Sequence, residues 1–169
     1  MLASRGSVIP FFHEQIKSGG PVTITTTGMT RFLLSLDQAV DTIFTAVREA
    51  RRGETYIPRV PSAKVTDIAG VLIGDRVIQT VITGIRPGEK VHEILISEEE
   101  CHRTIEHGRY YAILPILPEV RDGEQIVPAL KGEYSSADNV MDRESLIQLL
   151  RQHSLMVEDS LFLEGELLR

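Results

Sequence analysis

Prolines interrupt the segments of this chain that most resemble β-strands, and this limits the sheet that the chain can build. The runs PVTIT, ETYIPRV and RYYAILPIL (residues 21–25, 54–60 and 109–117) have the composition of strands, but each contains a proline. Proline cannot donate a ladder hydrogen bond, so it is confined to strand ends, bulges and sheet edges. We therefore predict a mixed α/β fold of small sheets packed against helices, without a large parallel sheet.

Helical segments alternate with these short strands. The clearest begins at Ser35, which forms a capping box with Gln38 three residues later, and its apolar residues recur at helical spacing. That apolar face consists of Leu36, Val40, Ile43, Phe44 and Val47. Further helices are predicted from a Ser7 cap to Lys17, over 66–73, over 89–95 and after an Asp142 cap. A buried strand is predicted over 76–83, and residues 118–140 are predicted to be rich in loops.

Composition points to an ordinary globular protein. Its 169 residues suit a single domain, 1–169, which we expect to be looser from about residue 118. The net charge of −6 argues against nucleic acid as a partner, and no apolar run reaches the ~20 residues of a membrane helix. A single cysteine, Cys101, suits a reducing compartment, and no secretory leader is recognisable. We therefore expect a cytoplasmic protein without a membrane partner.

The sequence contains no self-contained catalytic set. It has no G-x-G-x-x-G dinucleotide fingerprint, no phosphate loop, no G-x-S-x-G elbow, and no tyrosine followed four residues later by lysine. Cys101, His102 and His107 are the one metal-like cluster, but their spacing matches no established site, so we predict a polar loop there. We predict no catalytic residue, no cofactor-binding residue and no metal ligand in this chain.

Three arginines stand at positions suited to an anionic ligand. Arg5 lies just before a predicted helix start, Arg31 precedes an apolar stretch, and Arg86 lies in the turn RPGEK. Guanidinium groups bind phosphates with paired hydrogen bonds, and helix N-termini also favour anions. A converging set would suit a diphosphate. The alternative for each arginine is an exposed charge or an ion pair with a carboxylate; for Arg86 this would be Glu89 or Glu93.

Several stretches, in order along the chain, resemble one protein family. They are SRGSVIPFF, MTRFLLSLDQAVD, YIPRVPS, KVTDIA, GIRPGEKVHEIL and GEYSSADN. Together they resemble the C-terminal half of the extended short-chain dehydrogenase/reductases that act on UDP-sugars in polysaccharide biosynthesis. Members of that family include UDP-N-acetylglucosamine 4,6-dehydratases and capsular-polysaccharide UDP-glucose 4-epimerases. The resemblance covers nearly the whole chain.

The resemblance implies a two-lobed enzyme. An N-terminal Rossmann lobe binds NAD(P) and carries the catalytic residues, and a smaller α/β lobe binds the UDP moiety. This chain resembles the second lobe, with the Rossmann lobe largely missing, so the resemblance implies a truncated or split enzyme. Partners would then be a UDP-sugar and either a separate Rossmann-lobe chain or further copies of this chain. The chain alone is predicted to be inactive.

The resemblance also assigns roles to individual residues. Arg86 would contact the diphosphate, Glu89 the ribose, and Arg5 and Arg31 would add charge or brace the pocket. An apolar wall and backbone groups around the uracil would come from the segments VIPFF and PVTI, which contain Val8, Pro10 and Thr23.

Three functions stay open on the sequence. Among members of the family that the chain resembles, Pro87 favours a 4,6-dehydratase over a 4-epimerase, and a non-catalytic module for nucleotide-sugar binding or assembly is the third reading. Because a partner lobe would be absent, we also expect an exposed apolar face, and we expect it at Val8, Ile9 and Phe12.

Overall fold

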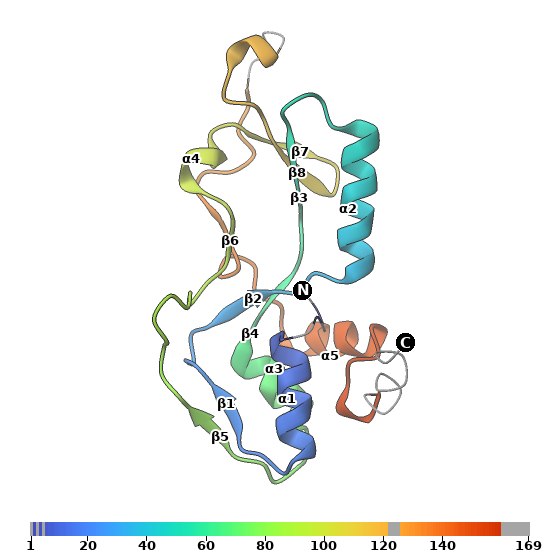
Figure 1. Ribbon diagram of the computed structural model, residues 1–169, viewed down its shortest axis with the longest axis vertical. Helices are drawn as coiled ribbons and strands as arrows, with labels where there is room; N and C mark the ends of the chain where they lie inside the picture. The colour runs from blue at the N-terminus through green and yellow to red at the C-terminus, as the bar shows by residue number, and fades with distance from the viewer. Residues whose placement is uncertain (1, 3, 5, 122–125, 160–169) are drawn as a thin grey trace.

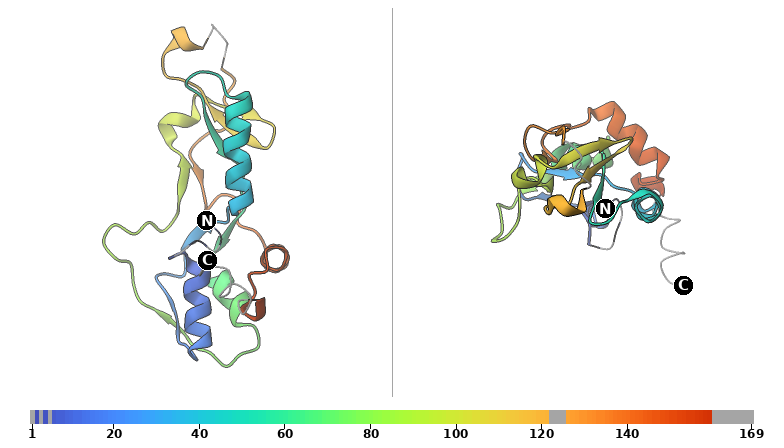
Figure 2. Two further views of the ribbon diagram at one scale, coloured as in Figure 1. Left: turned by 45° about the vertical axis from the view of Figure 1, so that its right-hand side comes forward. Right: turned by 90° about the horizontal axis from the view of Figure 1, so that it is seen from above.

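The computed structural model describes residues 2, 4, 6–121 and 126–159. These residues form an elongated mixed α/β structure, as expected from the sequence, in which helices pack against several small sheets (Figure 1). One end holds α1, α3, α5 and the β1–β5 pair, and the other end holds α2 and the strands β3, β7 and β8. The strands β2 and β4 lie between the two ends. Figure 2 shows the same elongated arrangement after a 45° turn.

The helices are short, and four of them were expected from the sequence. Their bounds are α1 Val8–Lys17, α2 Leu36–Glu49, α3 Val65–Ile73, α4 Glu98–Cys101 and α5 Arg143–Gln152, with 3-10 turns η1 at Pro118–Val120 and η2 at Val157–Asp159. Ser35 and Gln38 form both hydrogen bonds of the predicted capping box, and Asp142 accepts from the Ser145 amide at the start of α5. Ser7 occupies the N-cap of α1, but its side chain makes no capping hydrogen bond.

The strands are two to four residues long, as the prolines led us to expect. Their bounds are β1 Val22–Ile24, β2 Thr30–Phe32, β3 Thr55–Pro58, β4 Ser62–Lys64, β5 Thr80–Ile82, β6 Ile94–Ile96, β7 Thr104–His107, β8 Tyr110–Ile113 and β9 Tyr134–Ser135. They form the sheets β1–β5, β2–β4, β3–β8–β7 and β6–β9. Among the pairs of named strands in the described residues, only β1–β5 is parallel, in the register Val22 to Thr80.

The main hydrophobic core joins α1, β1, α3 and α5. Its fully buried side chains include Ile9, Phe12, Ile68, Leu72 and Leu146. The apolar residues Leu146 and Leu150 of α5 are both buried in this core. The C-terminal helix therefore packs into the same core as α1, although the chain between residues 118 and 140 is mostly loop.

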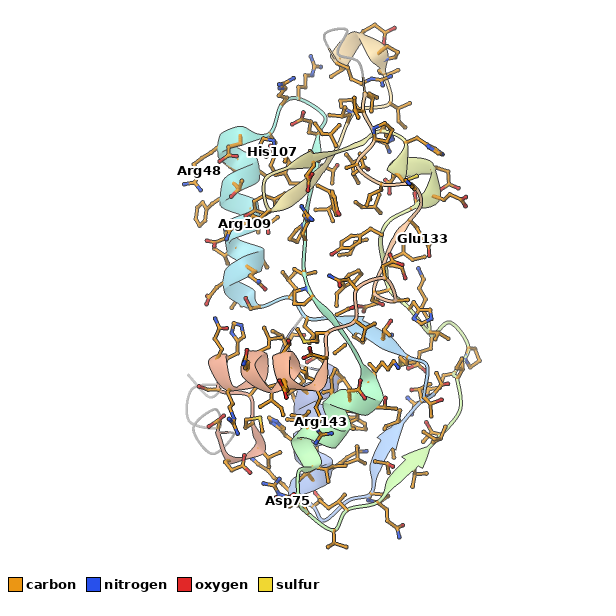
Figure 3. All side chains as sticks on the ribbon, turned by 180° about the vertical axis from the view of Figure 1, so that it is seen from behind. Arg48, Asp75, His107, Arg109, Glu133 and Arg143 are labelled. Carbon is orange, nitrogen blue, oxygen red and sulfur yellow. The ribbon has the colours of Figure 1, made fainter. Side chains whose placement is uncertain are left out.

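At the other end, α2 covers the three-stranded sheet with one face only. Ala46 and Ala50 pack against Tyr56, Tyr110 and Ala112 of that sheet. The β7–β8 hairpin also contacts the helix: His107 approaches Glu49 at 3.2 Å, and Arg109 forms an ion pair with Asp41 at 3.1 Å (Figure 3).

Two predictions for the middle of the chain are wrong. Residues 76–83 do not form a buried strand, because β5 is only three residues long and all three are exposed. Residues 89–95 do not form a helix, because the segment starts in a turn and ends in β6. Residues 76–83 have the apolar composition of a buried strand. Among the described strands, however, β5 pairs with β1 alone, and no second strand lies beside it.

The exposed apolar face lies on α2, not on α1 as expected. Ile9 and Phe12 are each 1% exposed. The exposed apolar residues of α2 are those of the face predicted from helical spacing: Leu36, Val40, Ile43, Phe44 and Val47. The sequence thus placed these residues on one face correctly, but that face is turned away from the sheet and carries no described cover.

We expect the α2 face to promote self-association of the isolated chain, since exposed apolar patches mark contact surfaces. Phe44→Glu should weaken this association about tenfold or more, because burying one such side chain contributes ~1.5–3 kcal/mol. Sedimentation velocity over a range of concentrations measures it. Val77→Glu is the matched control, because Val77 is fully exposed outside α2. Concentration-independent monomers of the unmodified chain would contradict the expectation.

A second prediction concerns His13, which links α1 to the segment after α5. It is 6% exposed, and its Nε2 lies 2.9 Å from the Leu155 carbonyl. Burial lowers the pKa of His13 below its ordinary value, although the bond to Leu155 opposes this. The unfolded chain therefore binds a proton more readily than the folded one, and the free energy of unfolding falls as pH drops below about 6.5.

The slope from this one group is at most about 1.4 kcal/mol per pH unit. Denaturant unfolding between pH 5 and 8 measures it. His13→Gln can retain a donor to Leu155 but cannot titrate, so its stability should change less over this range. An equal pH dependence in both proteins would show that His13 is not responsible.

Candidate functional site

A cavity of about 490 Å³ lies between α1, β1, β2 and the loop that follows β5. It brings together residues that are far apart in the sequence. Of the seven predicted binding residues, Val8, Thr23, Arg31, Arg86 and Glu89 line it. Pro10 is not among the lining residues, and Arg5 lies outside the described residues. The apolar part of the lining includes Phe11, Met29 and Leu33.

Arg86 is presented to this cavity by a tight turn. The Glu89 amide donates to the Arg86 carbonyl at 3.0 Å, and Gly88 has a φ of 83°. Proline at the second position and a positive φ at the third are the signature of a type II turn, which explains the order Arg-Pro-Gly-Glu. The turn is not followed by a helix, so the expectation of a helix start beside Arg86 is wrong.

The Arg86 side chain is exposed and available for a ligand. Among the residues that the structure describes, no carboxylate forms an ion pair with its guanidinium, so neither Glu89 nor Glu93 takes it up. The alternative reading of Arg86 as half of a structural ion pair therefore finds no support in these contacts.

Glu89 has local partners that fix its position. Its carboxylate accepts from the Thr25 hydroxyl at 3.1 Å and from the Arg86 amide at 3.3 Å. These bonds tie the turn to the end of β1. Glu89 still lines the cavity, and a carboxylate has room for more than two hydrogen bonds.

Arg31 differs from Arg86, because its guanidinium already binds backbone. It donates to the carbonyls of Thr30 at 2.7 Å, Val91 at 3.2 Å and Lys90 at 3.1 Å. Its Nε lies 3.8 Å from a Glu93 oxygen. Two roles were expected for Arg31, added charge or bracing; these contacts hold the backbone of residues 90 and 91, and its positive charge lies at the cavity wall.

The N-terminus of α1 also faces the cavity. Gly6, Ser7, Val8 and Ile9 all line it, and the first amide groups of a helix have no partner within the helix. The Ser7 hydroxyl oxygen is buried and has no hydrogen-bond partner among the described residues. A helix N-terminus with an unpaired hydroxyl is suited to an anion.

Thr23 is held in place by Gln15 of α1. The Gln15 side-chain amide donates to the Thr23 hydroxyl at 2.7 Å and accepts from the Thr23 amide at 3.0 Å. This pair fixes β1 relative to α1 at the wall of the cavity. Gln15 could not be identified from the sequence, because it lies on a helix with no motif around it and only the fold brings it to Thr23.

The described residues do not form the arrangement of a dinucleotide-binding fold. The parallel pair β1–β5 leads into no glycine-rich loop that opens a helix, which is the arrangement that binds a pyrophosphate in dinucleotide folds. Within the described residues there is no group of three or more metal-ligating side chains, and Cys101 is buried with its thiol 3.0 Å from the Glu98 carbonyl. No helix in that part of the chain is both long and apolar enough to cross a membrane.

The fold and the cavity define a mixed α/β domain with a pocket lined by Arg31, Arg86 and the start of α1. The chain belongs to the family described as "Polysaccharide biosynthesis protein", which matches residues 1–115. This confirms the family resemblance drawn from the sequence motifs.

The individual relatives carry two activity names. The chain is 41% identical over 150 residues to a UDP-N-acetylglucosamine 4,6-dehydratase (inverting) from Campylobacter jejuni, covering 82% of this chain and 44% of the relative. It is 40% identical over 145 residues to a UDP-glucose 4-epimerase from Rickettsia typhi, covering 80% of this chain and 42% of the relative. The chain thus spans less than half the length of these curated relatives.

A solved structure shares the fold. The X-ray structure of Pen from Bacillus thuringiensis matches 92% of this chain and 48% of its own chain, with a TM-score of 0.80 and 32% sequence identity. The agreement extends past residue 115, where the family match ends, since the coverage includes most of the chain.

Proposed function

We propose that this chain is the UDP-sugar-binding part of a nucleotide-sugar-modifying enzyme of polysaccharide biosynthesis. The observation that carries the proposal is the convergence of Arg86, the α1 N-terminus and the unpaired Ser7 hydroxyl on one cavity. Two phosphates need cationic and N–H donors in close proximity, and this cavity supplies both. Its remaining lining is partly apolar, which suits a base or sugar ring.

Within the cavity, we assign the diphosphate to Arg86 and the α1 N-terminus. Glu89 is the candidate acceptor for a ribose hydroxyl, since its carboxylate lines the cavity beside Arg86. Val8 and Thr23 lie on the wall assigned to the base. Arg31 supports the site by holding the 90–91 backbone. Arg5 and Pro10 have no assignment from these contacts.

Of the two reactions, we favour the 4,6-dehydratase. Pro87 stands in the turn that this activity is expected to share, and a relative with that name is 41% identical over 150 residues. The 4-epimerase is the alternative, because relatives of nearly equal identity carry that name. Both reactions would draw on NAD(P) held by a nucleotide-binding half, either on a separate chain or on the remainder of a longer protein.

The proposal is tested by completing the enzyme. We expect the 169-residue chain alone to convert neither UDP-N-acetylglucosamine nor UDP-glucose and to bind no NAD(P), because its described residues do not form the arrangement of a dinucleotide-binding fold. Joined to the nucleotide-binding half of the Campylobacter jejuni relative, it should support 4,6-dehydration, measured by product analysis. Conversion of UDP-glucose to its 4-epimer by the joined protein would favour the alternative. Turnover by the chain alone would overturn the assignment of this chain as the binding part.

A further inference from the structure

A cluster of polar side chains extends from the cavity wall into the interior, and the site described so far does not use its two buried hydroxyls, Thr30 and Ser136. The cluster consists of Thr30, His92, Glu93 and Ser136. Thr30 and Ser136 are 3% and 0% exposed, and neither lines the cavity. The four residues come from three separate segments. Thr30 lies in β2, His92 and Glu93 lie in the loop after the Arg86 turn, and Ser136 lies just after β9.

Hydrogen bonds connect all three segments. The Thr30 hydroxyl lies 2.8 Å from His92 Nδ1 and 2.7 Å from the Ser136 hydroxyl. The Glu93 amide donates to the Ser136 hydroxyl at 2.9 Å, and the Ser136 amide donates to the Glu93 carbonyl at 2.8 Å. Hydrogen bonds of this kind favour one arrangement of the segments that they join, because breaking them leaves the buried hydroxyls of Thr30 and Ser136 unpaired.

The cluster reaches the cavity through Glu93, and Val91 is bonded to Thr30 of β2. The Glu93 carboxylate accepts from the Phe32 amide at 3.0 Å, and the Val91 carbonyl accepts from the Thr30 amide at 3.0 Å. Glu93, Phe32 and Arg31 all line the cavity. Thr30 thus precedes the lining residue Arg31 in the chain, and the Ser136 hydroxyl is bonded to the amide of the lining residue Glu93.

The loop that carries Arg86 has few other attachments. Residues 84–88 are all exposed, so no core packing holds them. On one side the loop is fixed to the end of β1, by the Gly84 amide to the Thr25 carbonyl at 3.1 Å and by the Thr25 hydroxyl to Glu89. On the other side the attachment is the polar cluster together with the Arg31 contacts to residues 90 and 91.

We propose that Thr30 and Ser136 are positioning residues that set the placement of the Arg86 turn for diphosphate binding. The inference deepens the proposed function and rests on it for the ligand, but the placement of the turn stands on the hydrogen bonds alone. It also gives a role to a residue outside the family match, because Ser136 lies beyond residue 115.

The test uses Thr30→Val, which keeps the shape of the side chain but removes the hydroxyl, and Ser136→Ala. Thr104→Val is the matched control: Thr104 is 0% exposed in β7, and its hydroxyl donates to the Glu100 carbonyl at 2.8 Å, away from the cavity. For each variant of the 169-residue chain, hydrogen exchange of the peptide covering residues 84–93 and the dissociation constant for UDP are measured.

We expect exchange in residues 84–93 to rise about tenfold in Thr30→Val and Ser136→Ala but not in Thr104→Val, because only the first two release the loop. The dissociation constant for UDP should rise about tenfold in the same two variants. Thr30→Ser keeps the hydroxyl and should restore both values, which also separates loss of the hydrogen bond from general destabilisation.

Unchanged exchange of residues 84–93 in both cluster variants, or an equal rise in all three, would overturn the positioning role. If the unmodified chain bound no UDP while the cluster variants still released the loop, the proposed function would fail and the placement of the turn by the cluster would stand. If Arg86→Ala weakened UDP binding but the cluster variants with a released loop did not, the function would stand and the positioning inference would fail.

Discussion

Arg86→Ala is expected to weaken UDP binding by roughly ten- to a hundredfold in the enzyme completed with a nucleotide-binding half. The guanidinium is exposed at the cavity and free of ion pairs among the described residues, so its hydrogen bonds are available to the diphosphate. A charge-assisted hydrogen bond contributes ~1.5–3 kcal/mol, which corresponds to that loss of affinity. Titration calorimetry with UDP measures it.

Arg86→Lys separates charge from geometry. A lysine keeps the positive charge but cannot form the paired hydrogen bonds of a planar guanidinium, so it should recover only part of the affinity. Arg59→Ala is a suitable control, because Arg59 pairs with Glu106 away from this cavity. Equal affinity of the unmodified protein and Arg86→Ala for UDP would mean that the turn is structural.

The largest effect on stability is expected for Phe12→Ala. Phe12 is 1% exposed and packs in the core formed by α1, β1, α3 and α5. Replacing a buried phenylalanine by alanine costs about 3–5 kcal/mol, because the cavity left behind collapses only partly. Urea unfolding followed by circular dichroism gives the free energy of unfolding.

The neighbouring residue offers a matched control. Phe11 carries the same side chain on the same helix but is 47% exposed, so Phe11→Ala should cost much less than Phe12→Ala. This pair tests the correction that the structure makes to the expected exposure of Phe12. Similar losses in both variants would mean that Phe12 is not part of the core in solution.

Much of the local structure could be predicted from the sequence, because short-range chemistry determines it. The Ser35 capping box and the Asp142 cap were both visible as residue patterns and both form. Proline placement correctly indicated short strands in small sheets. Each of these features depends on residues that lie close together in the sequence, so local sequence patterns are sufficient to predict them.

Which apolar surface is buried could not be predicted in the same way. The spacing of Val40, Ile43 and Val47 correctly placed them on one face of α2, but the sheet packs against the other face, through Ala46 and Ala50. Residues 76–83 have the composition of a buried strand, and yet β5 has a single neighbour. Burial depends on what lies opposite an element, and periodicity contains no information about that.

The candidate site shows the same division. Arg86 and its turn could be found from the sequence, because Pro87 and Gly88 are a local signal for a type II turn. Arg31 donates to the carbonyls of residues 90 and 91, which lie about sixty residues away in the sequence. No local pattern predicts this contact. The hydrogen bond between Thr30 and Ser136 joins residues that lie even further apart in the sequence.

The most direct test of the central claim is a chemical-shift map of the ¹⁵N-labelled chain titrated with UDP, with uridine as the comparison ligand. If the cavity is the diphosphate site, UDP should shift the amides of Ser7, Val8, Arg86 and Gly88, and uridine should leave those of Arg86 and Gly88 unchanged, because it carries no phosphate. The amides of α2 should not move with either ligand. Shifts confined to α2, or equal shifts of the Arg86 and Gly88 amides with UDP and uridine, would contradict the assignment of this cavity to the diphosphate.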